Sequence, residues 1–186
     1  NRESNDTFEK QIFLLGIIGR TYTYLNDHNN AITYLERGLK KLQELYKFPH
    51  EKLTHIYNNI GWLEFQETNY NEAFIYFQKA LRCGLLDEKN NYKEISRSYN
   101  NIGEIYFVEN KLDLALGDFQ RAYKTLGLYS GNVHPSLFYM LSNIGNVYLK
   151  KKKPNKSIDY FEKALKICQS SLGNKHINTG RCYQFL

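Results

Sequence analysis

The sequence predicts an all-α solenoid built from helix–turn–helix repeats. The first observation behind this prediction is a recurring pentapeptide: Tyr-Asn-Asn-Ile-Gly occupies 57–61 and 99–103, and a softened copy, Leu-Ser-Asn-Ile-Gly, occupies 141–145. The second is the spacing, because each copy begins 42 residues after the previous one. A fixed period of this length is typical of stacked repeats, in which each repeat buries its apolar face against its neighbours.

Small and large residues recur at fixed distances from the glycine. Four repeats align on Gly19, Gly61, Gly103 and Gly145. Further along, each repeat has a small residue, a large apolar residue and another small residue: Ala31, Leu35 and Gly38; Ala73, Phe77 and Ala80; Ala115, Phe119 and Ala122; Ser157, Phe161 and Ala164. Small residues let two helices approach closely, and large ones fill the space between them. Each repeat is therefore expected to form a packed helical pair.

Polar segments separate the two helices of each expected pair. They read NDHNN at 26–30, ETNYN at 67–71, ENK at 109–111 and KKKPN at 151–155. Such clusters indicate turns, and Pro154 fits only because it lies in one.

These turns divide the chain into a lead-in and a series of repeats. The spans are 1–9 for the lead-in, 10–50, 51–92, 93–134 and 135–175 for four repeats, and 176–186 for the first helix of a truncated fifth repeat or a cap. Because the chain has no initiator methionine and ends within a helical pattern, we expect a fragment of a longer protein.

The segment YNNIGEIY (99–106) followed by ALGDFQRA (115–122) resembles the tetratricopeptide repeat signature. The resemblance implies a right-handed superhelical solenoid. Glu64 replaces a tyrosine and Ser157 replaces an alanine of the pattern. HEAT and armadillo arrays have similar periods but lack this order of small and large residues.

The period is longer than the usual value of about 34 residues for this family. The additional residues follow the last small position, so we expect a longer second helix and a longer exit loop. The loops repeat with the same spacing, since GNVH (131–134) and GNKH (173–176) are also 42 residues apart. His134-Pro135 at the start of a first helix and the Leu-Gly that closes the previous repeat resemble the kinesin light chain branch.

The face of each first helix opposite the glycine is expected to line a concave groove, because stacked repeats turn their first helices inward. The asparagines are expected on this open face, where packing does not require them. The predicted groove residues are Arg20, His55, Asn58, Asn59, Trp62, Arg97, Asn100, Asn101, Glu104, Tyr139, Ser142, Asn143 and Asn146. The first repeat departs from the pattern with Phe13 and Ile17, which predicts either a covering segment or a hydrophobic sub-pocket.

An asparagine side chain both donates and accepts, so a ladder of asparagines can pair with an extended peptide backbone. The kinesin light chain resemblance implies cargo-peptide contact for Asn58, Asn59, Asn100, Asn101 and Asn143. The alternative is a structural role, with bonds formed locally between repeats. A carboxylate clamp is disfavoured, because Gly16 and Arg20 stand where that arrangement needs lysine and asparagine.

The sequence therefore predicts a non-catalytic adaptor or scaffold that binds a protein or peptide. A peptide-sensing regulatory domain that controls an attached output domain, as in bacterial peptide-pheromone regulators, is the alternative, and a purely structural spacer is a third. No phosphate loop, nucleophile elbow or zinc-ligand pair appears, so no cofactor, metal or small-molecule substrate is expected. His50, His134 and His176 each begin a different repeat, which favours helix-entry capping.

The net charge of +6 is concentrated in the second half of the chain. Lys150, Lys151, Lys152 and Lys153 form a candidate basic patch or simply a solvated turn. Nucleic-acid binding is disfavoured, because most of the 16 tyrosines fall at core positions of the repeat.

The longest apolar run, Ile12–Ile18, is too short to cross a membrane, and the first residues do not form a signal peptide. Cys83, Cys168 and Cys182 have no close pair, which favours reduced thiols in the cytoplasm.

Overall fold

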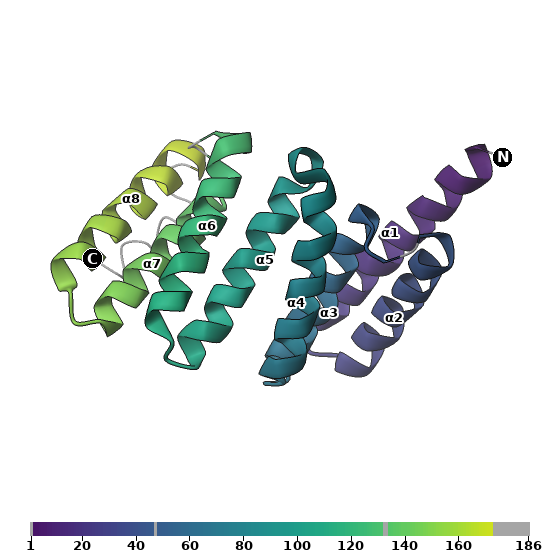
Figure 1. Cartoon of the computed structure of the whole chain (residues 1–186), viewed down its shortest axis with the longest axis horizontal. Coiled ribbons are helices and arrows are strands. Elements are labelled where there is room, and N and C mark those ends of the chain that lie inside the picture. Colours follow the sequence, from purple (N-terminus) through teal and green to yellow (C-terminus); the bar gives the residue numbers. More distant parts are fainter. Residues whose placement is uncertain (1, 47, 132–133, 173–186) are drawn as a thin grey trace. The chain divides into compact units, whose positions relative to one another are not determined.

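The structure, a computed structural model, describes residues 2–46, 48–131 and 134–172. These residues form eight α-helices and two short 3-10 helices, and they contain no strand (Figure 1). The elements are α1 (Arg2–Tyr24), α2 (His28–Leu45), η1 (Glu51–Leu53), α3 (Thr54–Gln66), α4 (Tyr70–Gly84), η2 (Leu85–Asp87), α5 (Glu88–Val108), α6 (Leu112–Ser130), α7 (Leu137–Lys150) and α8 (Pro154–Leu172). The all-α prediction is confirmed.

The chain divides into two compact units, Asn1–Ser98 and Tyr99–Leu186, which we call the first and second unit. Helix α1 packs on α2 and α3 on α4 in the first unit, and α7 packs on α8 in the second. None of the helices in the described part of the chain is long and apolar enough to span a membrane. The predicted helix at 176–186 lies outside the described residues, as do Cys182 and His176.

The recurring glycines lie where the two helices of a pair touch. A Cβ atom added to Gly61 would come within 2.7 Å of the Phe77 ring, and one added to Gly103 within 2.8 Å of the Phe119 ring. The equivalent distances are 2.6 Å from Gly145 to Phe161 and 2.6 Å from Gly19 to Leu35. The expected contact between a small residue of the first helix and a large residue of the second helix is therefore confirmed in all four pairs.

Each pair turns through one residue with a left-handed backbone. These residues, again 42 positions apart, are Asn26, Thr68, Asn110 and Lys152, with φ angles of 56°, 63°, 62° and 56°. The amide of the following residue donates to a carbonyl five residues earlier, as from Asn69 to Glu64 at 2.9 Å and from Lys111 to Tyr106 at 2.8 Å. This is the Schellman arrangement, which satisfies carbonyls at a helix end and normally uses glycine or asparagine.

Threonine is poorly suited to this backbone, because its branched Cβ is crowded at positive φ. Thr68 is exposed, so its side chain contributes little packing. We expect Thr68→Gly to raise the free energy of unfolding by about 1 kcal/mol, as measured by urea denaturation. Thr33→Gly, within α2, is the control and should lower it by about 0.3 kcal/mol. Destabilisation by Thr68→Gly would contradict the strain argument.

The additional residues of the long period are not placed in the same way in every repeat. Helices α2 and α6 are 18 and 19 residues long, which agrees with a lengthened second helix. Helix α4 has only 15 residues, and the chain continues through η2 directly into α5. The expectation is therefore wrong for this repeat. The physical reason is that the segment after Gly84 has no further glycine and no proline to interrupt a helix, whereas Pro49 and Pro135 follow α2 and α6.

Candidate functional site

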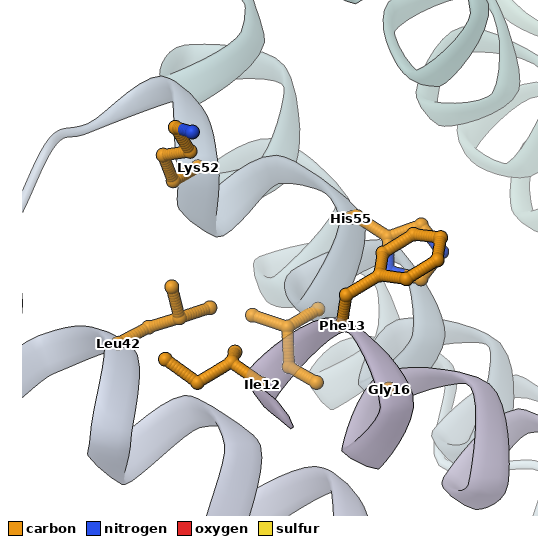
Figure 2. Close-up of a pocket in the computed structure, with 7 residues that line it drawn as sticks. Ile12, Phe13, Gly16, Leu42, Lys52 and His55 are labelled. Atoms are coloured by element: carbon orange, nitrogen blue, oxygen red, sulfur yellow. The ribbon is translucent and has the colours of Figure 1, made fainter. Parts of the chain in front are cut away.

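A pocket lies in the first unit, between the start of α3 and the facing sides of α1 and α2 (Figure 2). Its volume is about 180 Å³, and the residues that line it are Ile12, Phe13 and Gly16 of α1, Leu42 of α2, Lys52 of η1, and His55 and Ile56 of α3. The Phe13 ring lies beside the His55 ring, with 5.9 Å between their centroids. Phe13 is 58% exposed, so one wall of the pocket is accessible from solvent.

Only part of this pocket could be predicted from the sequence. His55 was a predicted groove residue, and Phe13 marked the first repeat as a candidate hydrophobic sub-pocket. Ile12, Leu42, Lys52 and Ile56 were missed, because they come from four separate elements whose contact is a result of folding. The signal that pointed here was the apolar character of the first repeat at positions where the others are polar.

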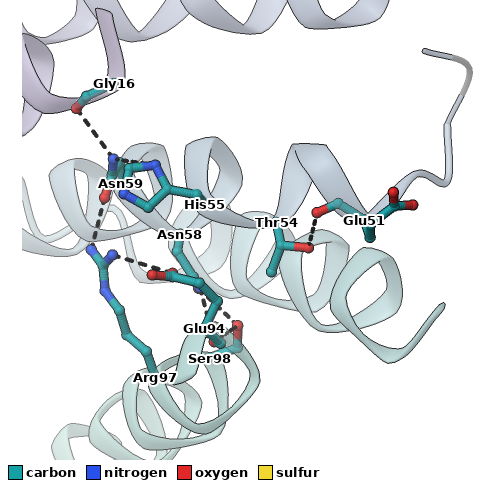
Figure 3. A network of polar contacts seen from close by, with 9 residues as sticks. All are labelled: Gly16, Glu51, Thr54, His55, Asn58, Asn59, Glu94, Arg97 and Ser98. Atoms are coloured by element: carbon teal, nitrogen blue, oxygen red, sulfur yellow. Dashed lines mark hydrogen bonds and ion pairs between the residues drawn. The ribbon is translucent and has the colours of Figure 1, made fainter. Parts of the chain in front are cut away.

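A network of hydrogen bonds adjoins the pocket and links α1, α3 and α5 (Figure 3). The Asn59 side-chain amide donates to the Gly16 carbonyl at 3.3 Å, and its oxygen accepts from Arg97 at 2.9 Å. The Asn58 amide donates to the Glu94 carbonyl at 3.0 Å and to the Glu94 carboxylate at 2.9 Å. The Ser98 hydroxyl donates to Asn58 Oδ1 at 2.8 Å.

These contacts correct one expectation. Asn58, Asn59, Asn101 and Ser142 were placed on an open face, but they are only 0%, 2%, 5% and 6% exposed. A helical wheel shows which way a side chain leaves its own helix, but it does not show whether another helix covers that direction. Around Asn58 and Asn59, hydrogen bonds to α5 and α1 fill the space. Ligand contact by these four residues stays a prediction, and it would require a ligand to displace their surroundings.

A second polar cluster lies in the second unit. The Asn100 amide donates to Glu104 Oε1 at 2.7 Å. The Asn143 amide donates to Asn100 Oδ1 at 3.0 Å and also lies 3.4 Å from Glu104 Oε1. All three residues are half-buried. Burial raises the pKa of Glu104 above the usual range of a glutamate, and the hydrogen bonds from Asn100 and Asn143 only partly oppose this effect.

Other predicted groove residues are accessible to different degrees. His55, Trp62, Arg20 and Asn146 are half-buried, and Tyr139 is 46% exposed. Burial lowers the pKa of His55, and the nearby Glu94 opposes this, so the ring is mainly neutral at neutral pH. The Trp62 indole stacks on Phe65 at 5.4 Å.

Two regions of the sequence match a known family pattern, described as the tetratricopeptide repeat, at residues 11–84 and 136–186. The chain belongs to the tetratricopeptide repeat family.

Solved structures share the tetratricopeptide fold of this chain. BtubC (BKLC) from P. vanneervenii is 18% identical with a TM-score of 0.79, over 99% of this chain and 76% of that one. Aspartyl phosphate phosphatase F from Bacillus subtilis is 18% identical with a TM-score of 0.81, over 95% and 44%. RapI is 20% identical with a TM-score of 0.73, over 87% and 57%. At these identities the likeness shows the fold alone. No curated protein sequence matches the chain.

The four lysines of the candidate basic patch lie at the turn of the last described tetratricopeptide repeat. Lys150 donates to the Phe107 carbonyl at 3.3 Å, and Lys151 pairs with Asp113. Lys152 provides the left-handed turn residue, and Lys153 is exposed. Two of the four ammonium groups thus hold this repeat against the previous one, and a ligand role for the patch stays a prediction.

Two recurring histidines cap helix entries in the tetratricopeptide repeats, as expected. His50 Nδ1 accepts from the amide of Lys52 at 3.3 Å, and His134 Nδ1 accepts from the amide of Ser136 at 3.2 Å. Across the ranges that the structure describes, no group of three or more His, Cys, Asp or Glu residues is placed to hold a metal ion.

Proposed function

We propose that this chain is a non-catalytic protein-interaction module that binds a peptide or a helical segment of a partner protein. The ligand would lie on the faces formed by the first helices of the pairs. The observation that carries the proposal is the pocket of the first unit, which combines an apolar interior with an exposed aromatic wall at Phe13.

The pocket has the size of one side chain. Sites for small molecules and cofactors usually measure about 300–1,000 Å³, whereas an apolar cavity of about 150 Å³ accommodates benzene. The volume of about 180 Å³ therefore suits a leucine or phenylalanine side chain. Ile12, Leu42 and Ile56 supply apolar contact with such an anchor.

Polar groups beside the pocket suit the rest of a peptide. His55 offers a ring nitrogen, and Lys52 brings an ammonium group to the lining. Arg20 is half-buried and lies close enough to His55 to influence its pKa. Anchors in a pocket surrounded by polar contacts are the usual arrangement of binding hot spots.

The test is a peptide-display screen against the wild-type chain, followed by affinity measurements on a selected peptide with two variants. Phe13→Ala removes a wall of the pocket and should weaken binding by about tenfold or more. Leu14→Ala is the matched control, because Leu14 is 54% exposed against 58% for Phe13 but does not line the pocket. Its effect should stay within about twofold. A screen that selects no peptide, or equal losses in both variants, would overturn the proposal.

A peptide-sensing regulatory domain is the second candidate. It is favoured by the contact between the pocket and the hydrogen-bond network. Gly16 and His55 line the pocket. Asn59 forms hydrogen bonds with the Gly16 carbonyl and with Arg97 of α5. A ligand that moved α1 would therefore disturb contacts of α5. Hydrogen exchange distinguishes the two candidates: a sensor predicts altered exchange in α5 when peptide binds, and a simple adaptor predicts changes confined to the pocket.

The proposed compartment is the cytoplasm. It is supported by Cys83 and Cys168, which are free thiols, because unpaired cysteines are more usual than disulfides in a reducing compartment.

A further inference from the structure

Glu104 of the second unit is held in place through one oxygen only. Both amide groups that reach it, from Asn100 and Asn143, approach Oε1. The other oxygen, Oε2, has no hydrogen-bond partner among the described residues, and it is not closed off from solvent. The carboxylate is therefore oriented by Asn100 of its own helix α5 and by Asn143 of α7, while one of its acceptors stays open.

Glu104 also lacks a cation. Other acidic side chains of this unit form ion pairs. Asp118, for example, pairs with Arg121 at 2.9 Å. No ion pair reaches Glu104 within the described part of the chain, and the groups that influence its pKa include no cation. Lys150 of α7 is directed elsewhere, with its ammonium group 3.3 Å from the Phe107 carbonyl.

An oriented carboxylate without a cation is unfavourable in the unliganded protein. Half-burial removes part of its hydration, and an ion pair would normally compensate this loss. Charged groups that are partly buried and have no ion-pair partner are concentrated at functional sites, because a ligand supplies the missing partner there. Since Asn100 and Asn143 already fix the side chain, little rotational freedom would be lost when a cation binds.

We propose that Glu104 and Asn143 form a recognition site for a cationic side chain of a peptide ligand, with arginine as the preferred residue. The guanidinium group would donate to Glu104 Oε2 and to Asn143 Oδ1, which has no partner among the described residues. Tyr139 lies one helical turn before Asn143 and is 46% exposed, so its ring can stack on the guanidinium plane. Arginine fits better than lysine, because its several donors lie in one plane. The inference rests on the proposed function only in that a peptide carries the cation.

The first experiment tests the site with small probes, so it does not depend on the binding of a peptide. The pKa of the Glu104 side chain is measured by carbon-13 NMR in the wild-type chain, with Nα-acetyl-argininamide and then with the neutral isostere Nα-acetyl-citrullinamide. A cation at Oε2 stabilises the ionised form, so the arginine probe should lower the pKa of Glu104 and the citrulline probe should not. Glu109, which pairs with Lys111 at 2.8 Å, is the internal control and should respond less.

The second experiment uses three matched peptides from the display screen that contain arginine, lysine or citrulline at one position. The wild-type chain should bind the arginine peptide about tenfold or more tightly than the citrulline peptide, with the lysine peptide between them. Glu104→Gln should abolish this preference while it keeps an oxygen for the amides of Asn100 and Asn143. Glu109→Gln removes the same charge a short distance along the chain and should keep the preference.

The outcomes separate the two proposals. Peptide binding that is indifferent to Glu104→Gln, with no response of the Glu104 pKa to the arginine probe, overturns this inference and leaves the proposed function standing. A pKa response without any peptide binding supports the cation site and overturns the proposed function. Equal responses of Glu104 and Glu109 to the arginine probe would show general screening and would overturn the site.

Discussion

Replacement of Phe77 with alanine is expected to destabilise the chain by about 3–5 kcal/mol. Phe77 is 0% exposed, and its ring lies against the Gly61 backbone, where a Cβ atom would be only 2.7 Å away. The variant therefore loses a fully buried ring and leaves a cavity that the close helix contact cannot collapse to fill. Urea denaturation followed by far-UV circular dichroism measures the loss.

Two further variants make this prediction specific. Ile75→Ala, on the same helix but 48% exposed, should cost less than about 1 kcal/mol. Gly61→Val approaches the same contact from the other side and should cost about 1–3 kcal/mol, because the added carbons overlap the Phe77 ring. If Phe77→Ala cost no more than Ile75→Ala, the glycine–phenylalanine contact could not be what holds the pair together.

Asn58→Ala should produce the second-largest effect, a loss of about 2–3 kcal/mol. The side chain is fully buried, and its removal takes one hydrogen bond from the Glu94 carboxylate and one from the Ser98 hydroxyl. Among the described residues, the carboxylate then keeps only Arg97 at 3.4 Å, and the hydroxyl keeps only the Glu94 carbonyl at 2.9 Å. Polar groups that lose a buried hydrogen bond have less to compensate their desolvation cost, and that cost is greater for a charged group. The free energy of unfolding is again the quantity to measure.

The control for Asn58 is an asparagine that the fold does not use. Asn71 is exposed in the first turn of α4, and Asn71→Ala should change the stability by less than about 0.5 kcal/mol. A loss of peptide binding in Asn58→Ala with unchanged stability would restore the view that this residue belongs to an open ligand face.

The parts of the fold that depend on one repeat were predictable from sequence. The distance of 16 residues from Gly61 to Phe77 is the same as from Gly103 to Phe119, and it specifies a contact between the two helices of one pair. Local chemistry also sufficed for His50 and His134, because a helix-entry cap involves only the next few residues.

Contacts between repeats could not be predicted in the same way. Asn58 and Asn59 have the same sequence surroundings as Asn100 and Asn101, so a single helix gives no reason to treat them differently. Their burial depends on which side chains the neighbouring repeats bring to them. Glu94 and Ser98 were missed for the same reason, since nothing in their own helix indicates that they bind an asparagine 36 or 40 residues earlier. The left-handed turn residues were missed because Thr68 and Lys152 do not favour that backbone.

The asparagine contacts also limit how such an array can be rearranged. Asn58 relies on Glu94 and Ser98, but the equivalent positions beside Asn100 are Ser136 and Met140, and Asn100 is instead bonded to Glu104 of its own helix and to Asn143. Two repeats with the same Tyr-Asn-Asn-Ile-Gly segment thus make different polar contacts with their neighbours. A shuffled gene that exchanged the second and third repeats would keep every glycine and phenylalanine in register. It would, however, place the buried Asn58 amide beside Ser136 and Met140 in place of Glu94 and Ser98. The order of the repeats is therefore part of the information that the chain encodes.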